Sequence, residues 1–197
     1  MTPEESRAWR PSLEGWSEDI LPWIRDIAPT LPKPARIVEV GAFKGRALVF
    51  WGEELRRLGH GASTRIVGVD AIFPRAAVPQ YAVPEGENHP DLHRNIAATK
   101  SDWEPVTIDL MLLESVVAAK TFEDESIDLC FIDASHDEAS VRLDIEAWTR
   151  TVKRGGILAG HDYGAKQWPG VKQAVDGLVD AVCVTRSVWS SRRGVHS

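Results

Sequence analysis

The sequence is poor in cysteine, with only Cys130 and Cys183 among its 197 residues. Two cysteines cannot build a disulfide framework, and without a Cys-x-x-Cys pair they do not indicate a zinc site. No apolar run is long enough to span a membrane. The acidic and polar N-terminus, MTPEESRAWRPS, does not look like a signal peptide. These absences predict a cytoplasmic protein without a membrane partner.

An excess of basic residues is also lacking. The chain carries 23 Lys and Arg against 29 Asp and Glu, for a net charge of −6. Nucleic-acid binders usually present a basic face, so we expect no nucleic-acid partner. Hydrophobic residues make up 43% and charged residues 26% of the chain, an ordinary globular mixture. A homo-oligomer stays open.

Proline and tryptophan are the residues in excess, with twelve and eight copies. Six prolines fall within residues 1–34, which we expect to form a helical lead-in to a single α/β domain over residues 35–197. Thr2 and Glu5 form a predicted capping box, and Ser17 is a candidate cap for a second helix. Four more prolines occupy a loop predicted over residues 71–90, a length typical of functional or mobile loops.

From Arg36 onward, short apolar runs alternate with helical patterns. The runs predict strands at 37–40, 65–70, 106–113, 126–134 and 157–160. Helices are predicted at 47–58, 91–97 (capped by Asp91), 116–122, 135–152 (capped by Ser135 and Glu138) and 169–178. The tail, residues 181–191, predicts either one long strand or a tight pair.

This alternation predicts a doubly wound, mostly parallel sheet with helices on both faces. Ligands of such sheets bind beyond the carboxyl ends of the strands, near the point where the strand order reverses. The residues that follow each strand are therefore the candidates for function.

The first strand runs into the turn Glu39-Val40-Gly41-Ala42-Phe43-Lys44-Gly45, whose glycines allow a ligand to approach the backbone. The dinucleotide fingerprint G-x-G-x-x-G is absent, because Phe43 stands at its middle glycine. This turn suits a cofactor without phosphates, and Glu39 could meet a positive group. Asp70 ends the second strand, where a carboxylate can accept both hydroxyls of a ribose.

With these residues the sequence resembles the class I S-adenosylmethionine-dependent methyltransferases over roughly residues 36–180. VEVGAFKGRA is similar to their first motif and IVGVD to their second. The stretch FIDASHDEASVRLDIEAWTRTVKRGGILAGHDY, followed by PGVKQAV, looks closest to the methyltransferase domain 24 family, which is related to catechol-type and macrocin-type O-methyltransferases. Ala47 stands where relatives often carry Ser.

The resemblance implies a Rossmann-like fold, S-adenosylmethionine as cofactor and a small-molecule substrate. It implies that the cofactor contacts Glu39, Gly41, Ala42, Phe43, Gly45, Asp70, Glu114, Ser115 and Asp133. Within this set, the turn residues would face the methionine portion, Asp70 the ribose, Glu114 and Ser115 the adenine, and Asp133 the methyl-donor end.

A hydroxyl acceptor must also lose its proton, to a base or with the help of a metal. The candidate catalytic residues are His136, His161 and Asp162, which with Asp133 follow two adjacent strands. In catechol-type relatives the same strand ends hold a divalent metal, which implies Asp133, His161 and Asp162 as ligands. Oxygen ligands suit Mg²⁺, whereas a histidine ligand favours Mn²⁺, Zn²⁺ or iron.

The leading hypothesis is O-methylation of a small molecule, with a metal or a histidine base both left open. Two alternatives remain: a nicotinamide-dependent oxidoreductase, which would share the sheet and Asp70, and a non-catalytic cofactor-binding module. The lead-in and the proline-rich loop are hypothesised to choose the substrate.

Overall fold

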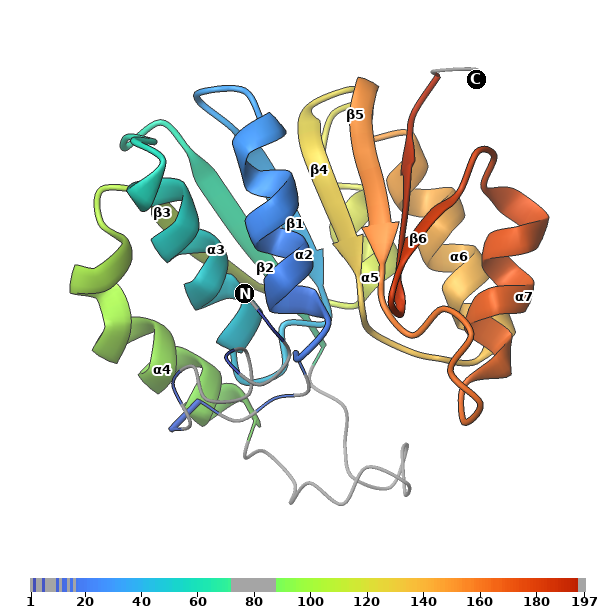
Figure 1. The fold of residues 1–197 in the computed structure, drawn as a ribbon, viewed down its shortest axis with the longest axis horizontal. Helices are drawn as coiled ribbons and strands as arrows, with labels where there is room; N and C mark the ends of the chain where they lie inside the picture. The colour runs from blue at the N-terminus through green and yellow to red at the C-terminus, as the bar shows by residue number, and fades with distance from the viewer. Residues whose placement is uncertain are drawn as a thin grey trace.

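The computed structural model describes residues 2, 5, 10, 12–13, 15, 17–71 and 88–194. They build a seven-stranded sheet in the order β3-β2-β1-β4-β5-β7-β6 (Figure 1). The strands are β1 Arg36–Val40, β2 Arg65–Asp70, β3 Thr107–Leu112, β4 Ile127–Ile132, β5 Val152–Gly160, β6 Cys183–Thr185 and β7 Val188–Arg192. The first five are parallel and β7 is antiparallel to both its neighbours. The predicted doubly wound, mostly parallel sheet is confirmed.

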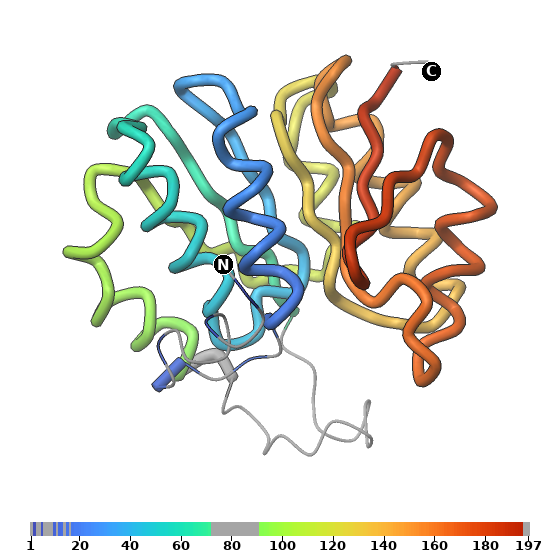
Figure 2. The backbone as a smooth tube through the Cα atoms, in the orientation of Figure 1, coloured from blue at the N-terminus to red at the C-terminus, as the bar shows by residue number. Residues whose placement is uncertain are grey.

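Helices cover both faces of this sheet (Figures 1 and 2). One face is covered by α2 Ile20–Ile27, α3 Arg46–Arg57 and α4 Asn88–Trp103. The other is covered by α5 Ser115–Ala119, α6 Glu138–Thr149 and α7 Pro169–Leu178. Strand β1 shows why: Ile37 packs into the first layer, whereas Val38 and Val40 pack into the second. Because both faces are covered, the central strand β4 is buried along its whole length.

Helix α2, within the lead-in, packs onto the same core as the sheet. Trp23 of α2 meets the rings of Trp51 and Phe131 at centroid distances of 6.1 and 5.3 Å. The capping box is confirmed, since Thr2 Oγ1 accepts from the Glu5 N–H at 3.1 Å and Glu5 Oε2 accepts from the Thr2 N–H at 2.7 Å.

Three predicted helix caps were wrong. Asp19, not Ser17, precedes α2. Helix α4 begins at Asn88, so Asp91 lies inside its first turn and pairs with Lys44 at 3.4 Å. Asp137 caps α6 by accepting from the Ser140 N–H at 3.0 Å. This cap takes the place of the predicted Ser135–Glu138 capping box.

Other boundaries moved as well. Helix α5 ends at Ala119 rather than at residue 122, and α6 ends at Thr149. Val152 begins β5, because it pairs with Ile127 of β4. Gly155 and Gly156 therefore lie within β5, where its pairing with β4 is irregular, and not before the strand as predicted.

The tail forms the tight antiparallel pair that the sequence left open. Thr185 of β6 pairs with Val188 of β7, so Arg186 and Ser187 make a two-residue turn. Arg186 has the positive φ of 58° that such turns require. Residues 72–87 of the proline-rich loop lie outside the described residues. Among the helices that the structure describes, none has the length and apolar character needed to cross a membrane.

Asp144 is an ionisable side chain buried between α6 and the sheet, with 5% of its surface exposed. Burial raises the pKa of Asp144 to about 6, and a hydrogen bond with Ser115 only partly opposes this. Because the folded state holds this proton more tightly than the unfolded chain, Asp144 makes the free energy of unfolding fall as pH rises from about 4 to about 6.

We expect Asp144→Asn to remove this pH-dependent loss, because an amide cannot ionise. The variant should be more stable than the wild type at pH 8, by at most about 3 kcal/mol, and the two should be nearest each other at pH 4. Urea unfolding at both pH values measures the difference. Glu146→Gln, an exposed change on the same helix, is the control and should show no such pH dependence. An advantage of the variant over the wild type that is no larger at pH 8 than at pH 4 would contradict the assignment.

Candidate functional site

The candidate residues gather at the carboxyl edge of β1, β2, β4 and β5. The strand order reverses between β1 and β4, so the turns that leave these two strands run to opposite faces of the sheet. The sequence predicted the site at this edge, and the structure brings the turns after β1 and β4 into contact there.

The turn after β1 is held in a fixed shape by hydrogen bonds to β2. The N–H groups of Gly41 and Ala42 donate to the Val69 carbonyl at 2.8 and 3.2 Å. Gly41 has a φ of 93°, and a Cβ added there would lie 2.0 Å from the Asp133 carbonyl oxygen. Glycine is therefore required both by the backbone conformation and by the contact with the end of β4.

Asp70 takes part in the same turn. Its Oδ2 accepts from the Phe43 N–H at 2.7 Å, and Phe43 has a positive φ of 47°. The carboxylate at the end of β2 thus stabilises a strained turn residue at the end of β1. Its ribose-binding role stays a prediction, to which this contact adds a structural role that the sequence did not indicate.

Glu39 is the least usual residue of the site. It lies in β1 with 4% of its surface exposed, and its Oε2 atom has no hydrogen-bond partner among the described residues. Burial, and then the neighbouring carboxylates of Asp133 and Asp70, raise the pKa of Glu39 well above its usual range. A buried carboxyl group beside two like charges favours a cationic partner.

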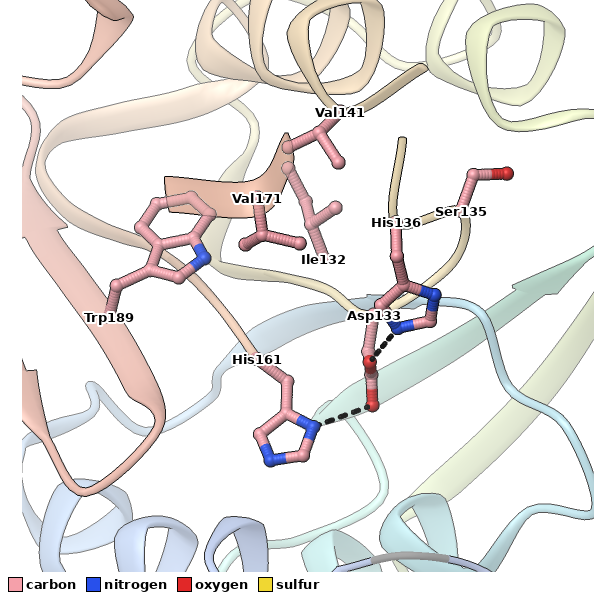
Figure 3. Close-up of a pocket in the computed structure, with 8 residues that line it drawn as sticks. All are labelled: Ile132, Asp133, Ser135, His136, Val141, His161, Val171 and Trp189. Atoms are coloured by element: carbon pink, nitrogen blue, oxygen red, sulfur yellow. Dashed lines mark ion pairs between the residues drawn. The ribbon is translucent and has the colours of Figure 1, made fainter. Parts of the chain in front are cut away.

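Four ionisable side chains meet at the ends of β4 and β5, and Figure 3 shows Asp133, His136 and His161 among them. His136 Nε2 lies 2.8 Å from Asp162 Oδ2 and 3.6 Å from Asp133 Oδ1. His161 Nδ1 lies 3.7 Å from Asp133 Oδ2 and 3.6 Å from Asp162 Oδ2. All four are between 12% and 22% exposed. The sequence predicted this convergence of His136, His161, Asp133 and Asp162.

The two carboxylates control the charge of the two histidines. Burial by itself lowers the pKa of His136, but Asp133 and Asp162 outweigh it and raise the value to about 9. Burial by itself also lowers the pKa of His161. Asp133 and Asp162 outweigh this effect and raise the pKa. For Asp133, burial acts to raise the pKa, and both histidines together lower it.

The cluster also has the donor set of a metal site. Ligand atoms of Asp133, His136 and Asp162 all lie within 4.8 Å of one another. The sequence predicted His161 with the two aspartates, whereas this grouping contains His136. Two carboxylate oxygens and one imidazole nitrogen fit a divalent ion of the Mn²⁺ class better than Mg²⁺, which prefers oxygen alone.

Glu114 and Ser115 follow β3 at the same edge. Glu114 is the residue before α5 and makes no side-chain cap there. Ser115 Oγ accepts a hydrogen bond from the Trp148 indole at 2.9 Å, so its hydroxyl is engaged in packing α5 against α6. The adenine role of both residues stays a prediction.

Two further residues of the site were missed by sequence reasoning. Trp168 stacks on the His136 ring at a centroid distance of 4.6 Å and an interplanar angle of 24°. Ser187 lies in the β6–β7 turn, with its Oγ 2.9 Å from His161 Nε2. The only signal for Trp168 was its place directly before Pro169, at the start of α7, and no signal in the sequence pointed to Ser187.

Comparison with known proteins finds a family match. A family model described as a methyltransferase domain, domain 24 of that series, matches residues 38–163. No curated protein matches the chain.

Several solved structures have a similar fold. One is CalS11, a TDP-rhamnose 3′-O-methyltransferase, with 17% identity, a TM-score of 0.63, and coverage of 89% of this chain and 78% of that one. Another is the O-methyltransferase NovP, with 16% identity, a TM-score of 0.62 and coverage of 89% and 80%. A third is an O-methyltransferase from Bacillus cereus in complex with SAH, with 14% identity, a TM-score of 0.60 and coverage of 97% and 89%.

We expect Gly41→Ala to damage the site through the backbone. The new Cβ would collide with the Asp133 carbonyl and force a residue with a side chain into positive φ, for a loss of about 3 kcal/mol or more in the free energy of unfolding. Urea unfolding measures it. Gly61→Ala, where nothing lies within 4 Å of the added atom, should change stability by no more than about 0.5 kcal/mol. Equal effects at the two positions would refute the close contact.

Proposed function

Because the chain belongs to the methyltransferase domain 24 family of S-adenosylmethionine-dependent methyltransferases, we propose that it transfers a methyl group to an oxygen atom of a small molecule. The acceptor would lie beside Asp133, His136, His161 and Asp162, at the carboxyl edge of the sheet. The cofactor would lie over the turn after β1, where the sequence predicts a ligand and where the strand order reverses.

The observation that carries the proposal is the buried Glu39 carboxyl group. Its Oε2 atom lacks a partner among the described residues, and Asp70 and Asp133 both repel its charged form. S-adenosylmethionine brings a sulfonium and an ammonium group, which would supply the missing positive charge. A nicotinamide dinucleotide would instead bring an anionic pyrophosphate toward these carboxylates, so the oxidoreductase hypothesis is disfavoured.

Bound S-adenosylmethionine supplies an electrophilic methyl group, and the chain's own residues prepare the acceptor. The rigid turn at Gly41 and Phe43 would fix the cofactor, and positioning alone can contribute much of the rate. His136 and His161 are the candidate bases for the acceptor proton, because both lie at the strand ends and contact carboxylates that stabilise their protonated forms. This second cluster beside the cofactor turn favours an enzyme over a non-catalytic binding module.

A divalent metal is a further part of the proposal. Asp133, His136 and Asp162 have the donor atoms and spacing to hold one. A metal held there would lower the pKa of an acceptor hydroxyl. The sequence-based choice of His161 as a metal ligand remains an alternative. In that case His136 would be the base that accepts the proton.

The neighbours in fold support a class of acceptor. One structure with this fold is the TDP-rhamnose 3′-O-methyltransferase CalS11, and another is the O-methyltransferase NovP. We propose a hydroxylated small molecule, a sugar or a phenol. The cytoplasmic location and the homo-oligomer remain predictions from the sequence.

We expect S-adenosylmethionine, and not NADH, to bind the folded wild type in calorimetry. Glu39→Gln should weaken this binding about 10- to 100-fold, because the amide cannot match the positive charge. The same change should raise the thermal stability of the ligand-free protein, because it removes a buried carboxyl that is repelled by its neighbours.

Glu104→Gln, an exposed change at the amino edge of the sheet, is the matched control and should alter neither property. Folded protein that gives no heat with millimolar S-adenosylmethionine would end the proposal. Unchanged affinity in Glu39→Gln would remove Glu39 from it.

We expect Mn²⁺, followed by its electron paramagnetic resonance signal, to bind the wild type at one site. Asp162→Asn should weaken that binding at least about 10-fold, since it replaces an anionic ligand by a neutral one. Asp176→Asn, which neutralises an exposed carboxylate on α7, serves as the comparison and should leave Mn²⁺ binding as it was. If the two variants bind Mn²⁺ alike, the metal part of the proposal fails.

A further inference from the structure

A chain of hydrogen bonds joins the N-terminus of α2 to the candidate active site. The Ser187 hydroxyl donates to Asp19 Oδ2 at 2.7 Å, and the same hydroxyl oxygen lies 2.9 Å from His161 Nε2. Asp19 precedes α2 and Ser187 belongs to the β6–β7 turn, so the link joins segments 168 residues apart in the sequence. None of the sequence motifs accounts for it.

The backbone holds all three residues of this link in place. The Tyr163 N–H donates to the Ser187 carbonyl at 2.9 Å, which fixes the β6–β7 turn against the end of β5. The His161 N–H donates to the Ile132 carbonyl at 3.1 Å, which continues the pairing of β4 with β5. Asp19 makes no side-chain cap on α2, so its carboxylate is directed to Ser187 instead of to its own helix. This is an unusual use of an aspartate at a helix N-terminus.

The direction of the hydrogen bonds decides which nitrogen of His161 carries a proton. An ionised carboxylate only accepts, and a serine hydroxyl has one proton to donate. Ser187 gives that proton to Asp19, so its oxygen can only accept from His161. His161 Nε2 must therefore be the protonated nitrogen whenever the ring is neutral.

The other nitrogen, Nδ1, then faces the reacting groups. It lies 3.7 Å from Asp133 Oδ2 (Figure 3) and 3.6 Å from Asp162 Oδ2, distances beyond a normal hydrogen bond between nitrogen and oxygen. In the neutral ring this atom presents its lone pair toward the carboxylates and toward the place proposed for the acceptor. The opposite tautomer would present an N–H there, which can neither accept a proton nor bind a metal.

We propose that Asp19 and Ser187 are positioning residues that hold His161 as its Nε2–H tautomer, so that Nδ1 serves the methyl-transfer site. The purpose of this tautomer rests on the proposed function, whereas the tautomer itself is a property of the protein alone. Helix α2 of the lead-in and the C-terminal hairpin thereby act together on one imidazole ring.

The experiment is ¹⁵N NMR of the imidazole side chains, because the shifts of a protonated and an unprotonated ring nitrogen differ strongly. In the wild type we expect neutral His161 to be almost wholly Nε2–H. Asp19→Asn can donate its amide protons to Ser187, which frees Ser187 to donate to Nε2, so the main tautomer should change to Nδ1–H. Ser187→Ala should give a mixture, and Ser187→Thr, which keeps the hydroxyl, should restore the wild-type tautomer.

Asp26→Asn, an exposed change of the same charge on α2, is the matched control and should leave the His161 signals unchanged. Calorimetry with S-adenosylmethionine on the same proteins separates the two ideas. If no cofactor binds but the tautomer responds as described, the proposed function fails and the positioning role stands. If His161 keeps its Nε2–H form in Asp19→Asn, or is Nδ1–H in the wild type, the positioning role is overturned whatever the cofactor does.

Discussion

The contact between Gly41 and the backbone of Asp133 is the constraint on which the site depends. At the reversal point of the sheet, the turns leaving β1 and β4 must diverge to opposite faces, yet their first residues touch. Any side chain at residue 41 would meet the Asp133 carbonyl, and the Asp133 N–H donates to the Val40 carbonyl at 2.7 Å. Because these two strand ends are joined so closely, Glu39 and Asp133 are brought near enough to interact.

That closeness has an electrostatic consequence. Glu39, Asp70 and Asp133 end three neighbouring strands, and burial makes their mutual repulsion costly. His136 and His161 balance the negative charge of Asp133, and the same interaction raises the pKa values of both histidines. Glu39 has no such balance among the described residues. One sheet edge therefore holds a histidine-neutralised part, suited to an acceptor and a metal, and a part that lacks a cation, suited to the cofactor.

The segments outside the family match complete this arrangement. Matched residues end at 163, while α2 lies before them and the β6–β7 hairpin after them. Trp23 anchors α2 onto the core through Trp51 and Phe131, which places Asp19 beside the hairpin turn. The excess of tryptophan thus has a structural meaning at this position, since a large aromatic side chain helps to fix a short helix on the core. Trp168 acts similarly on His136 from the start of α7.

The sequence by itself determined the parallel sheet and the alternation of strands and helices along the chain, and it predicted the edge at which function lies. Periodicity and glycine turns are local signals, so β2 was predicted at its observed bounds and Glu39, Gly41, Asp70, Asp133 and Asp162 were found at strand ends. Caps were predicted less well, because Asp19 rather than Ser17 precedes α2 and Asp137 rather than Ser135 caps α6. Only the tertiary structure decided that His136 joins the two aspartates, that Phe43 is held by Asp70, and that Asp19 reaches His161 through Ser187. These contacts join residues from different elements, and their distances are set by how the strands and helices pack rather than by any spacing along the chain.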